Sequence, residues 1–416
     1  MAEAAEAGKA ESWRQRAGSP AIESRILSWK REAENTMQYR SFGKLDWKVS
    51  ALGFGCMRLP TLDGQRTSPN IDEAEALRMI RHAIDSGVNY LDTAYPYHEG
   101  QSEVVVGKAL QGGYREKVRL ATKLPVWMVN GPADFDKLLN EQLEKLQTSY
   151  IDFYLVHALN HGRWQDIVLK HNLQSRAAAA LADGRIRYLG FSFHDDYESF
   201  EEIVNGSDLW SFCQIQYNYM DTENQAGTRG LKLAASKGLA VVVMEPLMGG
   251  RLADPPKEIR ETMESFAVRR SPAEWALQWL WDQPEVSVVL SGMSTMTQVE
   301  DNLRFAGTSR IQSFGEAEQA LIAEAGDKYR ARTVIPCSKC SYCMPCPNGV
   351  NIPGNFDLFN YAHLFDDVAV ARFKYKVFLT EEQRSGSCID CGTCEGLCPQ
   401  KIEIGEWMPK VSALLA

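Results

Sequence analysis

Short apolar runs alternate with amphipathic stretches from Lys44 to about Arg304, and this alternation restricts the possible fold more than any other feature of the sequence. In the amphipathic stretches, such as residues 71–87 and 135–149, apolar residues recur every three or four positions, as on one face of a helix. The apolar runs are nearly continuous, which is typical of parallel strands covered on both faces. There are eight such runs, at 49–57, 88–94, 118–125, 151–158, 186–194, 212–220, 239–247 and 286–293.

Eight strand–helix units of this kind predict a (β/α)8 TIM barrel, in which residues at the C-terminal ends of the strands carry the chemistry. A doubly wound open sheet is the alternative, but no Gly-x-Gly-x-x-Gly follows the first strand. Residues 315–332 predict one further helix, after which Pro336 interrupts the pattern. We therefore expect an N-terminal extension at 1–36, the barrel at 37–332 and a second domain at 333–416.

The composition argues against several classes of protein. The 416 residues fit one barrel-sized domain plus an appendage. With 45 basic and 54 acidic side chains, the chain lacks the basic balance of a nucleic-acid-binding protein. No apolar run approaches the roughly 20 residues that a membrane span needs. Residues 1–36 show no secretory signal; we expect a poorly ordered or helical extension, with Met37 as an alternative start.

Four polar side chains stand where a barrel would gather them at one mouth. Asp92, Lys123 and His157 end the second, third and fourth strands. Tyr97 follows Asp92 by a short loop. When hydride adds to a carbonyl carbon, negative charge develops on oxygen, and a tyrosine beside a cation can donate the required proton. We expect Lys123 to be that cation, Asp92 to hold it charged, and His157 to orient the carbonyl oxygen.

At these positions the chain resembles the aldo-keto reductase family, over about residues 37–310. The similar segments are LGFGCM (52–57), NYLDTAYPYHEGQSE (89–103), ATKLP (121–125), DFYLVH (152–157), LGFSFH (189–194), QIQYN (214–218), EPLMGG (245–250) and SGMSTMTQVEDN (291–302). The resemblance implies an oxidoreductase that uses NADPH or NADH to interconvert a small-molecule carbonyl and an alcohol. It also implies a catalytic tetrad of Asp92, Tyr97, Lys123 and His157, with Tyr97 as the acid.

The same resemblance implies where the nucleotide binds. Gln214 would hydrogen-bond the nicotinamide carboxamide near Ser192, although Phe193 stands where the family often has Asn. Gly292 and Met293 fall where many relatives carry Lys or Arg for the 2′-phosphate, so the choice between NADPH and NADH stays open. Met244 would stack on the nicotinamide ring; Glu245, Pro246, Leu247, Gly249, Gly292, Met293 and Ser294 would line the pyrophosphate; and Gln298, Asp301 and Asn302 would reach the adenosine end.

Two other features of the barrel have less specific interpretations. Arg58, next to Cys56 and Met57 after the first strand, could hold a substrate carboxylate or be a solvated loop residue. Cys213 lies inside the sixth strand and is expected to serve packing.

Eight of the ten cysteines form two tight groups after Pro336, which favours metal binding in a reducing cytoplasm over disulfides. The second group has the spacing C-x2-C-x2-C-x3-C followed by proline, which is typical of [4Fe–4S] ferredoxins. Zinc is the alternative for four thiolates, but zinc modules normally pair two C-x2-C knuckles across a gap. The members of this second group are Cys388, Cys391, Cys394 and Cys398.

The first group is one residue shorter in its last gap and is also followed by a proline, Pro347. In two-cluster ferredoxins the fourth cysteine of each run binds the other cluster. This rule predicts one [4Fe–4S] cluster on Cys337, Cys340, Cys343 and Cys398, and the other on Cys388, Cys391, Cys394 and Cys346.

Residues 354–383, between the two groups, are apolar and aromatic in a way that suits helices better than a short hairpin. This domain therefore resembles a mostly α-helical, ferredoxin-like iron–sulfur domain, and the whole chain resembles the iron–sulfur branch of the aldo-keto reductases. The clusters could exchange electrons with a ferredoxin or another electron-transfer protein, or only stabilise the domain. FMN in a barrel phosphate site stays open as a bridge between hydride and single electrons. The alternative function is a redox-sensing or electron-transfer protein whose barrel binds nucleotide with little turnover.

Overall fold

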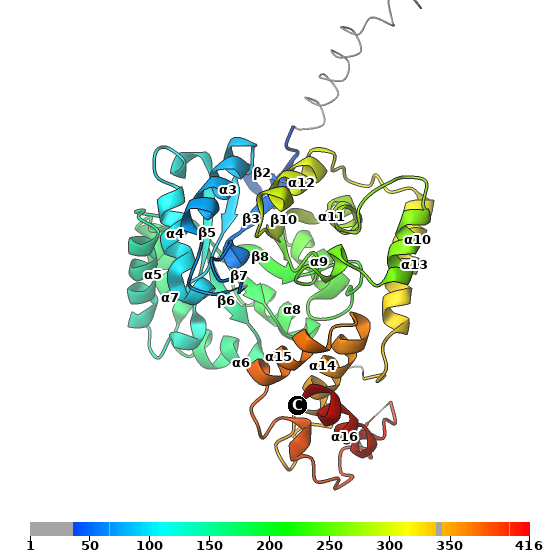
Figure 1. The fold of residues 1–416 in the computed structure, drawn as a ribbon. Coiled ribbons are helices and arrows are strands. Elements are labelled where there is room, and N and C mark those ends of the chain that lie inside the picture. The colour runs from blue at the N-terminus through cyan, green and yellow to red at the C-terminus, as the bar shows by residue number, and fades with distance from the viewer. Residues whose placement is uncertain (1–35, 66, 338–342, 399) are drawn as a thin grey trace, which may run out of the picture. The chain divides into compact units, whose positions relative to one another are not determined.

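The structure is a computed structural model that describes residues 36–65, 67–337, 343–398 and 400–416. Its central feature is a closed barrel of eight parallel strands surrounded by helices (Figure 1). Neighbouring strands follow one another in sequence, and the last strand pairs with the first to close the barrel. The predicted (β/α)8 barrel is thus confirmed. The strands are β3 (Leu52–Gly55), β4 (Tyr90–Asp92), β5 (Arg119–Leu124), β6 (Ile151–Leu159), β7 (Ile186–Phe193), β8 (Trp210–Gln216), β9 (Ala240–Met244) and β10 (Val286–Gly292).

The strands and helices form where the hydrophobic patterns predict them. β9 reads AVVVM, and its first four residues are buried, because a parallel strand faces the barrel interior on one side and a helix on the other. In the helix α3 (Glu73–Asp85), five apolar residues at helical spacing are buried, and Asp72 caps the first turn by accepting a hydrogen bond from the N–H of Glu75. The other barrel helices are α4 (Gln101–Ala109), α5 (Ala133–Lys145), α6 (His161–Arg163), α7 (Leu173–Ala182), α8 (Tyr197–Asn205), α9 (Gly227–Ser236), α11 (Pro272–Asp282) and α12 (Met296–Gly307).

A β-hairpin that the sequence analysis did not predict precedes the barrel. Its strands β1 (Tyr39–Phe42) and β2 (Leu45–Ser50) pair antiparallel. Phe42 packs in one cluster with barrel-interior residues such as Phe153, so the hairpin helps to fill the barrel core. Gly43 has a φ of 55°, and a Cβ there would lie 2.5 Å from the backbone nitrogen of Ala240. Only glycine fits this turn.

The chain divides into two compact units that are not continuous in sequence. The first unit holds the chain up to Pro246 together with Leu277–Ser313. The second unit holds Leu247–Ala276 and Phe314–Ala416. The division differs from the ranges expected above, because Leu247–Ala276 and the helix α13 (Glu316–Ala331) group with the C-terminal residues. Most of the expected N-terminal extension lies outside the described residues.

Within the second unit, helices surround an apolar core, as the residues between the cysteine groups predicted. The core contains Phe356, Phe359, Tyr375 and Val411. The hydroxyl group of Tyr375 lies 2.7 Å from the Oγ of Ser385, which connects this core to the segment that leads to the second cysteine group. The helices of this unit, besides α13, are α10 (Lys257–Ser265), α14 (Ile352–Leu364), α15 (Val368–Phe378) and α16 (Ile404–Leu415).

Arg251 joins the segment after β9 to the C-terminal helices of the same unit. Its Nη1 lies 2.5 Å from Oδ2 of Asp367, and its Nε donates to the hydroxyl of Tyr361 at 2.7 Å. Its guanidinium also lies over the rings of Tyr361 and Phe365, at 5.2 and 5.8 Å from their centroids. The ion pair is largely removed from water, since 15 % of the Arg251 side chain and 29 % of the Asp367 side chain are exposed.

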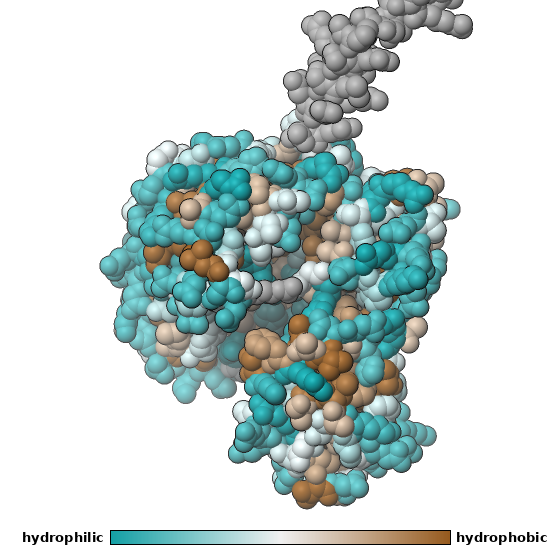
Figure 2. All heavy atoms as spheres, viewed as in Figure 1, coloured by the Kyte–Doolittle hydropathy of each residue, from teal (hydrophilic) through white to brown (hydrophobic). Residues whose placement is uncertain are grey.

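None of the helices in the described ranges is long and apolar enough to cross a membrane. Hydrophilic side chains cover much of the face shown in Figure 2, and apolar side chains reach it in separate patches.

We expect Arg251→Met to destabilise the second unit by about 1–3 kcal/mol, because Asp367 would lose its partner while remaining partly buried. Hydrogen exchange of the amides in α14 and α15 would report the change. Arg260→Met is the matched control: its ion pair with Asp254 is 45 % and 84 % exposed, so the change should stay below about 0.5 kcal/mol. Equal exchange rates in both variants would contradict the assigned role of Arg251.

Candidate active site and iron–sulfur site

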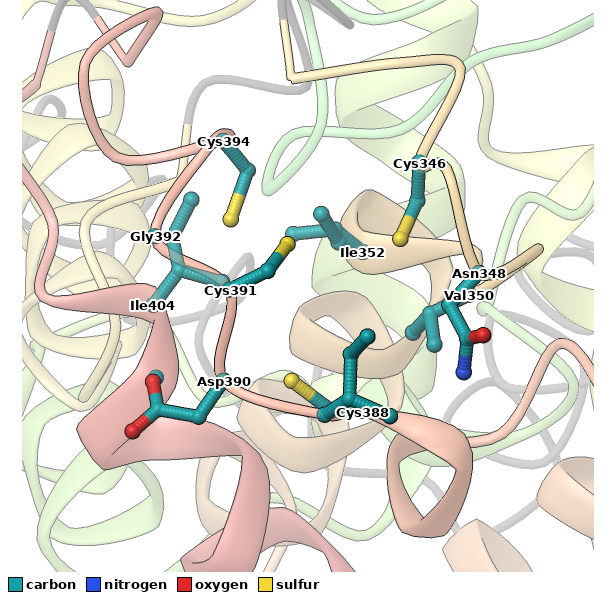
Figure 3. A pocket seen from close by; sticks show the side chains of 12 residues that line it. Cys346, Asn348, Val350, Ile352, Cys388, Asp390, Cys391, Gly392, Cys394 and Ile404 are labelled. Carbon is teal, nitrogen blue, oxygen red and sulfur yellow. The ribbon is translucent and has the colours of Figure 1, made fainter.

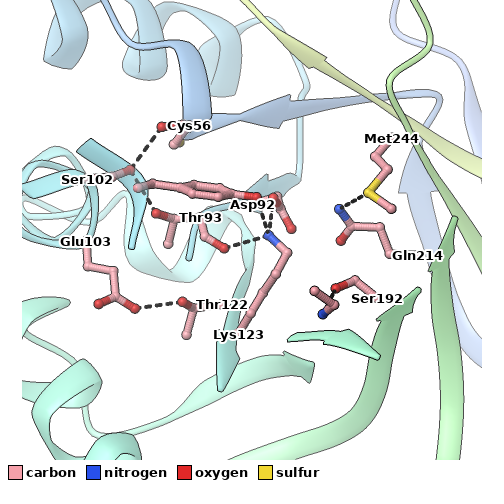
Figure 4. Close-up of polar contacts among 12 residues, drawn as sticks. Cys56, Asp92, Thr93, Ser102, Glu103, Thr122, Lys123, Ser192, Gln214 and Met244 are labelled. Carbon is pink, nitrogen blue, oxygen red and sulfur yellow. Dashed lines mark hydrogen bonds and ion pairs between the residues drawn. The ribbon is translucent and has the colours of Figure 1, made fainter. Parts of the chain in front are cut away.

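Lys123 is the centre of the polar group at the C-terminal ends of the barrel strands (Figure 4). Its side chain is fully buried, and its ammonium group donates three hydrogen bonds. The acceptors are Oδ1 of Asp92 at 2.6 Å, the carbonyl of Thr93 at 2.8 Å and the hydroxyl of Tyr97 at 3.2 Å. The structure thus brings together three of the four residues that were predicted to form the catalytic tetrad.

The surroundings of Lys123 set the protonation states in this group. Burial disfavours its charge, but Asp92 and Tyr97 outweigh burial and raise the pKa of Lys123 above its usual value. Burial also raises the pKa of Tyr97, and the charge of Lys123 opposes that rise. At neutral pH Lys123 is therefore a cation, and Tyr97 keeps a proton that the adjacent cation helps it to release.

His157, the fourth member of the predicted tetrad, lies beside this group. Its ring is 6.2 Å from the ring of Tyr97, edge to face, and 5.1 Å from the indole of Trp127. Burial and the nearby charges of Lys123 and Arg163 hold the pKa of His157 well below its usual value. The imidazole is therefore neutral. Its Nδ1 is buried and has no hydrogen-bond partner within the described chain.

His98, which the sequence analysis did not single out, fixes the turn that carries Tyr97. Its Nδ1 donates to the carbonyl of Ser68 at 2.7 Å, and its Nε2 accepts from the N–H of Leu59 at 3.2 Å. Burial lowers the pKa of His98, in keeping with a neutral ring that both donates and accepts. His98 and Glu99 have φ values of 52° and 53°, so this turn is strained and needs such contacts. The sequence could have pointed to His98, because it directly follows Tyr97.

Residues 100–103, GQSE, form hydrogen bonds that hold the strands carrying Asp92 and Lys123. Ser102 donates to the carbonyl of Cys56 at 3.0 Å, and its Oγ lies 2.8 Å from Oγ1 of Thr93. Glu103 is fully buried and accepts a hydrogen bond from Thr122 at 2.7 Å. Burial raises the pKa of Cys56 well above its usual value, so this thiol keeps its proton and serves packing.

At the end of β8, Gln214 presents an unpaired amide oxygen. Its Oε1 is buried and accepts no hydrogen bond from any described residue, while its Nε2 lies 3.6 Å from the sulfur of Met244. This orphaned acceptor fits the amide group of a nicotinamide. Ser192 accepts a hydrogen bond from the N–H of Ala158 at 2.7 Å. Phe193 is fully buried against Phe200 of α8, at a ring distance of 5.1 Å, which explains why a polar residue is absent there.

Arg58 lies beside Gly292, the last residue of β10. Gly292 and Met293 are the uncharged residues at which many relatives carry Lys or Arg. A Cβ on Gly292 would approach the Cγ of Arg58 to 2.8 Å, so glycine leaves the space that Arg58 fills. The hydroxyl of Ser294 donates to the carbonyl of Arg58 at 2.8 Å, and Gln298 Oε1 accepts from the N–H of Ser294 at 2.8 Å. The carbonyl of Arg58, Ser294 and the side chain of Gln298 thus form a hydrogen-bonded group at the start of α12, next to the side-chain carbons of Arg58.

The remaining candidate nucleotide residues have different surroundings. Asn302 is buried and donates to Ser291 at 3.0 Å, whereas Asp301 forms an exposed ion pair with Arg304. Met293 is buried, and Glu245 follows β9 with a φ of 55°. Pro246 ends one stretch of the first unit, and Leu247 and Gly249 belong to the second unit.

Four cysteines of the second unit line one pocket, with Val350, Ile352 and Ile404 among its apolar walls. Figure 3 shows their sulfur atoms around the same hollow. Four thiolates around one pocket fit an iron–sulfur cluster, in which each thiolate binds a different iron atom. The four are Cys346, Cys388, Cys391 and Cys394, which is the set that the ferredoxin rule predicted.

Of the other predicted set, Cys337, Cys343 and Cys398 pack against the same apolar core, and Cys340 lies outside the described residues. Burial raises the pKa of Cys394 to about 11, and the nearby Cys343 thiol adds to that rise. None of the described cysteines forms a disulfide.

The barrel and its polar site agree with comparisons to known proteins. Residues 51–313 match the aldo/keto reductase family. The chain belongs to the aldo-keto reductase family. Residues 336–403 match a 4Fe-4S dicluster domain, so this aldo-keto reductase carries an iron–sulfur domain at its C-terminus.

Relatives match the barrel part of this aldo-keto reductase. The uncharacterized oxidoreductase YqkF of Bacillus subtilis is 28% identical over 308 residues, which are 66% of this chain and 93% of the relative. L-galactose dehydrogenase of Arabidopsis thaliana is 27% identical over 315 residues, covering 68% and 92%. Among solved structures, the holo form of the aldo-keto reductase AKR11C1 from Bacillus halodurans is 28% identical with a TM-score of 0.58, covering 70% of this chain and 96% of that one. The chain is therefore an oxidoreductase of this family.

We expect Cys391→Ala to lower the iron content of the anaerobically purified protein by about four atoms per chain, the content of one cluster. Cys391 lines the pocket and is exposed, so its removal should leave the fold intact. Iron and sulfide would be measured per mole of folded protein. Cys213→Ala is the control, because Cys213 is buried in β8 and should keep all the iron. Unchanged iron in Cys391→Ala would contradict a cluster in this pocket.

Proposed function

We propose that this protein is an NADPH-dependent oxidoreductase that interconverts a carbonyl compound and an alcohol, with Tyr97 as the general acid and base. The observation that carries the proposal is the three-way contact of the buried Lys123 ammonium with Asp92, Thr93 and Tyr97. The cation next to the Tyr97 hydroxyl eases proton loss, and the neutral His157 can donate a hydrogen bond to a carbonyl oxygen.

The residues would act in a fixed order in the reducing direction. A bound nicotinamide would supply the hydride, and the unpaired Oε1 of Gln214 would accept a hydrogen bond from its carboxamide group. As negative charge develops on the substrate oxygen, Tyr97 gives up its phenolic proton to that oxygen. Lys123 stabilises the tyrosinate that remains, while Asp92 keeps the ammonium in place. His157 orients the substrate oxygen toward Tyr97.

Arg58, whose side-chain carbons lie beside Gly292, favours NADPH over NADH in this proposal. The 2′-phosphate adds negative charge to the adenosine end of the nucleotide, and Arg58 with Ser294 and Gln298 offers a cation and polar groups there. Arg58 follows β3, the first barrel strand, whereas many relatives carry the cation for the 2′-phosphate at the positions of Gly292 and Met293.

We propose further that the C-terminal domain binds two [4Fe–4S] clusters that exchange single electrons with a ferredoxin or a similar carrier protein. The pocket lined by Cys346, Cys388, Cys391 and Cys394 supports one of them. The second cluster would use Cys337, Cys340, Cys343 and Cys398. FMN is the open alternative for passing electrons between NADPH and a cluster.

We expect Tyr97→Phe to lower kcat for aldehyde or ketone reduction at least about 100-fold, because no other described group touching Lys123 can donate the proton. The Kd for NADPH should stay within about threefold. Steady-state kinetics over a carbonyl panel and fluorescence titration would measure both. Tyr95→Phe is the control, since its hydroxyl bonds Glu141 instead of Lys123. Tight NADPH binding without turnover of any carbonyl by the wild type would favour the redox-sensing alternative.

We expect a reduced ferredoxin-type carrier to produce the EPR signals of reduced clusters in the anaerobic protein, whereas NADPH alone produces none. The reason is that NADPH delivers electrons as pairs and a [4Fe–4S] cluster accepts one at a time. Dithionite is the positive control. Signals with NADPH alone would mean that a converter such as FMN is bound. Signals with dithionite but not with the carrier would point to clusters that only stabilise the domain.

A further inference from the structure

Arg163 is a charged side chain near the predicted tetrad that the proposed chemistry does not use. It ends the short helix α6 (His161–Arg163), which follows β6. Its guanidinium lies over the indole of Trp127, 5.3 Å from the ring centroid. The same indole is 5.1 Å from the imidazole of His157. Two successive ring contacts therefore connect Arg163 to the site of the proposed carbonyl chemistry.

The backbone after His157 fixes the guanidinium in this position. Arg163 Nη1 donates to the carbonyl of Ala158 at 2.6 Å, and the N–H of Arg163 donates to Oδ1 of Asn160 at 2.7 Å. Ala158 has a φ of 53°, which is unfavourable for alanine, and Ser192 holds its N–H at 2.7 Å. Strained residues of this kind persist where surrounding contacts enforce them, often at functional sites.

The charge of Arg163 has no acidic partner in the described ranges of the chain. None of the ion pairs found there includes Arg163, and its Nε and Nη2 donate no hydrogen bond to described residues. The nearby carboxylate of Asp195 accepts instead from the N–H of His161, and Glu202 pairs with the His161 ring. Partial burial lowers the pKa of Arg163. A guanidinium that is partly removed from water without a counter-ion favours an anionic ligand.

We propose that Arg163 binds a carboxylate of the substrate, so that this enzyme prefers carbonyl compounds that carry a carboxylate several bonds away from the carbonyl carbon. The free Nε and Nη2 form a planar fork that matches a carboxylate. Trp127 is 42% exposed and offers a flat apolar surface for the atoms between the two groups. This inference rests on the proposed reaction at Tyr97 and His157, and it deepens that proposal by naming a substrate class.

The other charged groups of the site are consistent with this assignment. Lys123 is paired with Asp92, and His157 is neutral. Glu245 favours the protonated forms of both Tyr97 and His194, so its carboxylate is near those residues. No ion pair between described residues joins Glu245 to Arg163. One guanidinium balances one carboxylate, whereas a phosphate monoester would bring a second negative charge.

The test compares 4-carboxybenzaldehyde with 4-formylbenzamide, which has the same size and no charge. We expect the wild type to favour the carboxylate in kcat/KM at least about tenfold. Arg163→Gln should lower kcat/KM for the carboxylate about 10- to 100-fold, mostly through KM, and change the amide less than about threefold. Arg163→Lys should recover part of the loss. Arg176→Gln, at an exposed arginine of α7, is the control and should change neither substrate. Equal losses for both aldehydes in Arg163→Gln would overturn the proposal.

A binding measurement separates failure of this inference from failure of the proposed reaction. Calorimetric titration of Tyr97→Phe protein loaded with NADP+, which has no hydride to transfer, would give the Kd for each aldehyde without turnover. Tighter binding of the carboxylate, lost in the Tyr97→Phe, Arg163→Gln double variant, supports the site even if the wild type reduces neither aldehyde. That absence of turnover would count against the proposed function alone. Equal binding of both aldehydes, or a preference that survives the loss of Arg163, overturns the role of Arg163.

Discussion

A buried ammonium group is the constraint on which the barrel site depends. Lys123 can remain charged in the protein interior only because Asp92, Thr93 and Tyr97 accept its three hydrogen bonds. These acceptors come from β4 and the turn after it, so the pairing of β4 with β5 must have the observed register, in which Asp92 faces Ala121. The braces at Ser102 and Glu103 and the contacts of His98 hold the same strands and turn in place.

The sequence allowed the barrel and the meeting of Asp92, Tyr97 and Lys123 to be predicted, because both depend on local patterns. Continuous apolar runs mark parallel strands, and a polar residue at the end of such a run must face the mouth. The hairpin at β1 and β2 was missed because β1 is only four residues long and only one residue separates β2 from β3, so β2 and β3 read as one run. Its position also depends on contacts of Phe42 with distant strands. The surroundings of Arg163 and Arg58 could not be predicted from the sequence either. Their surroundings come from Trp127 and Gly292, which are far from them in sequence.

The two cysteine groups illustrate a different degree of predictability. Their spacing was enough to indicate iron–sulfur binding. Cysteines separated by only two residues place three thiolates of one loop around the same metal centre, as a [4Fe–4S] cluster requires. Which cysteine serves which cluster depends on how the two loops meet in space. The pocket that joins Cys346 to Cys388, Cys391 and Cys394 brings together one of the two predicted ligand sets. The helices between the loops supply the apolar core on which both groups pack.

The discontinuous second unit has a consequence for how the protein folds during synthesis. Leu247–Ala276 leaves the ribosome about 100 residues before α14 and α15, to which Arg251 binds. At synthesis rates of about 5–20 residues per second, this segment waits roughly 5–20 s for its partners. During that time Arg251 has neither Asp367 nor Tyr361 to bind, whereas Trp275 can already contact Phe266 of the same segment. The barrel strand β10 emerges in the same interval, so β9 and β10 must pair although the chain between them includes a segment of the other unit.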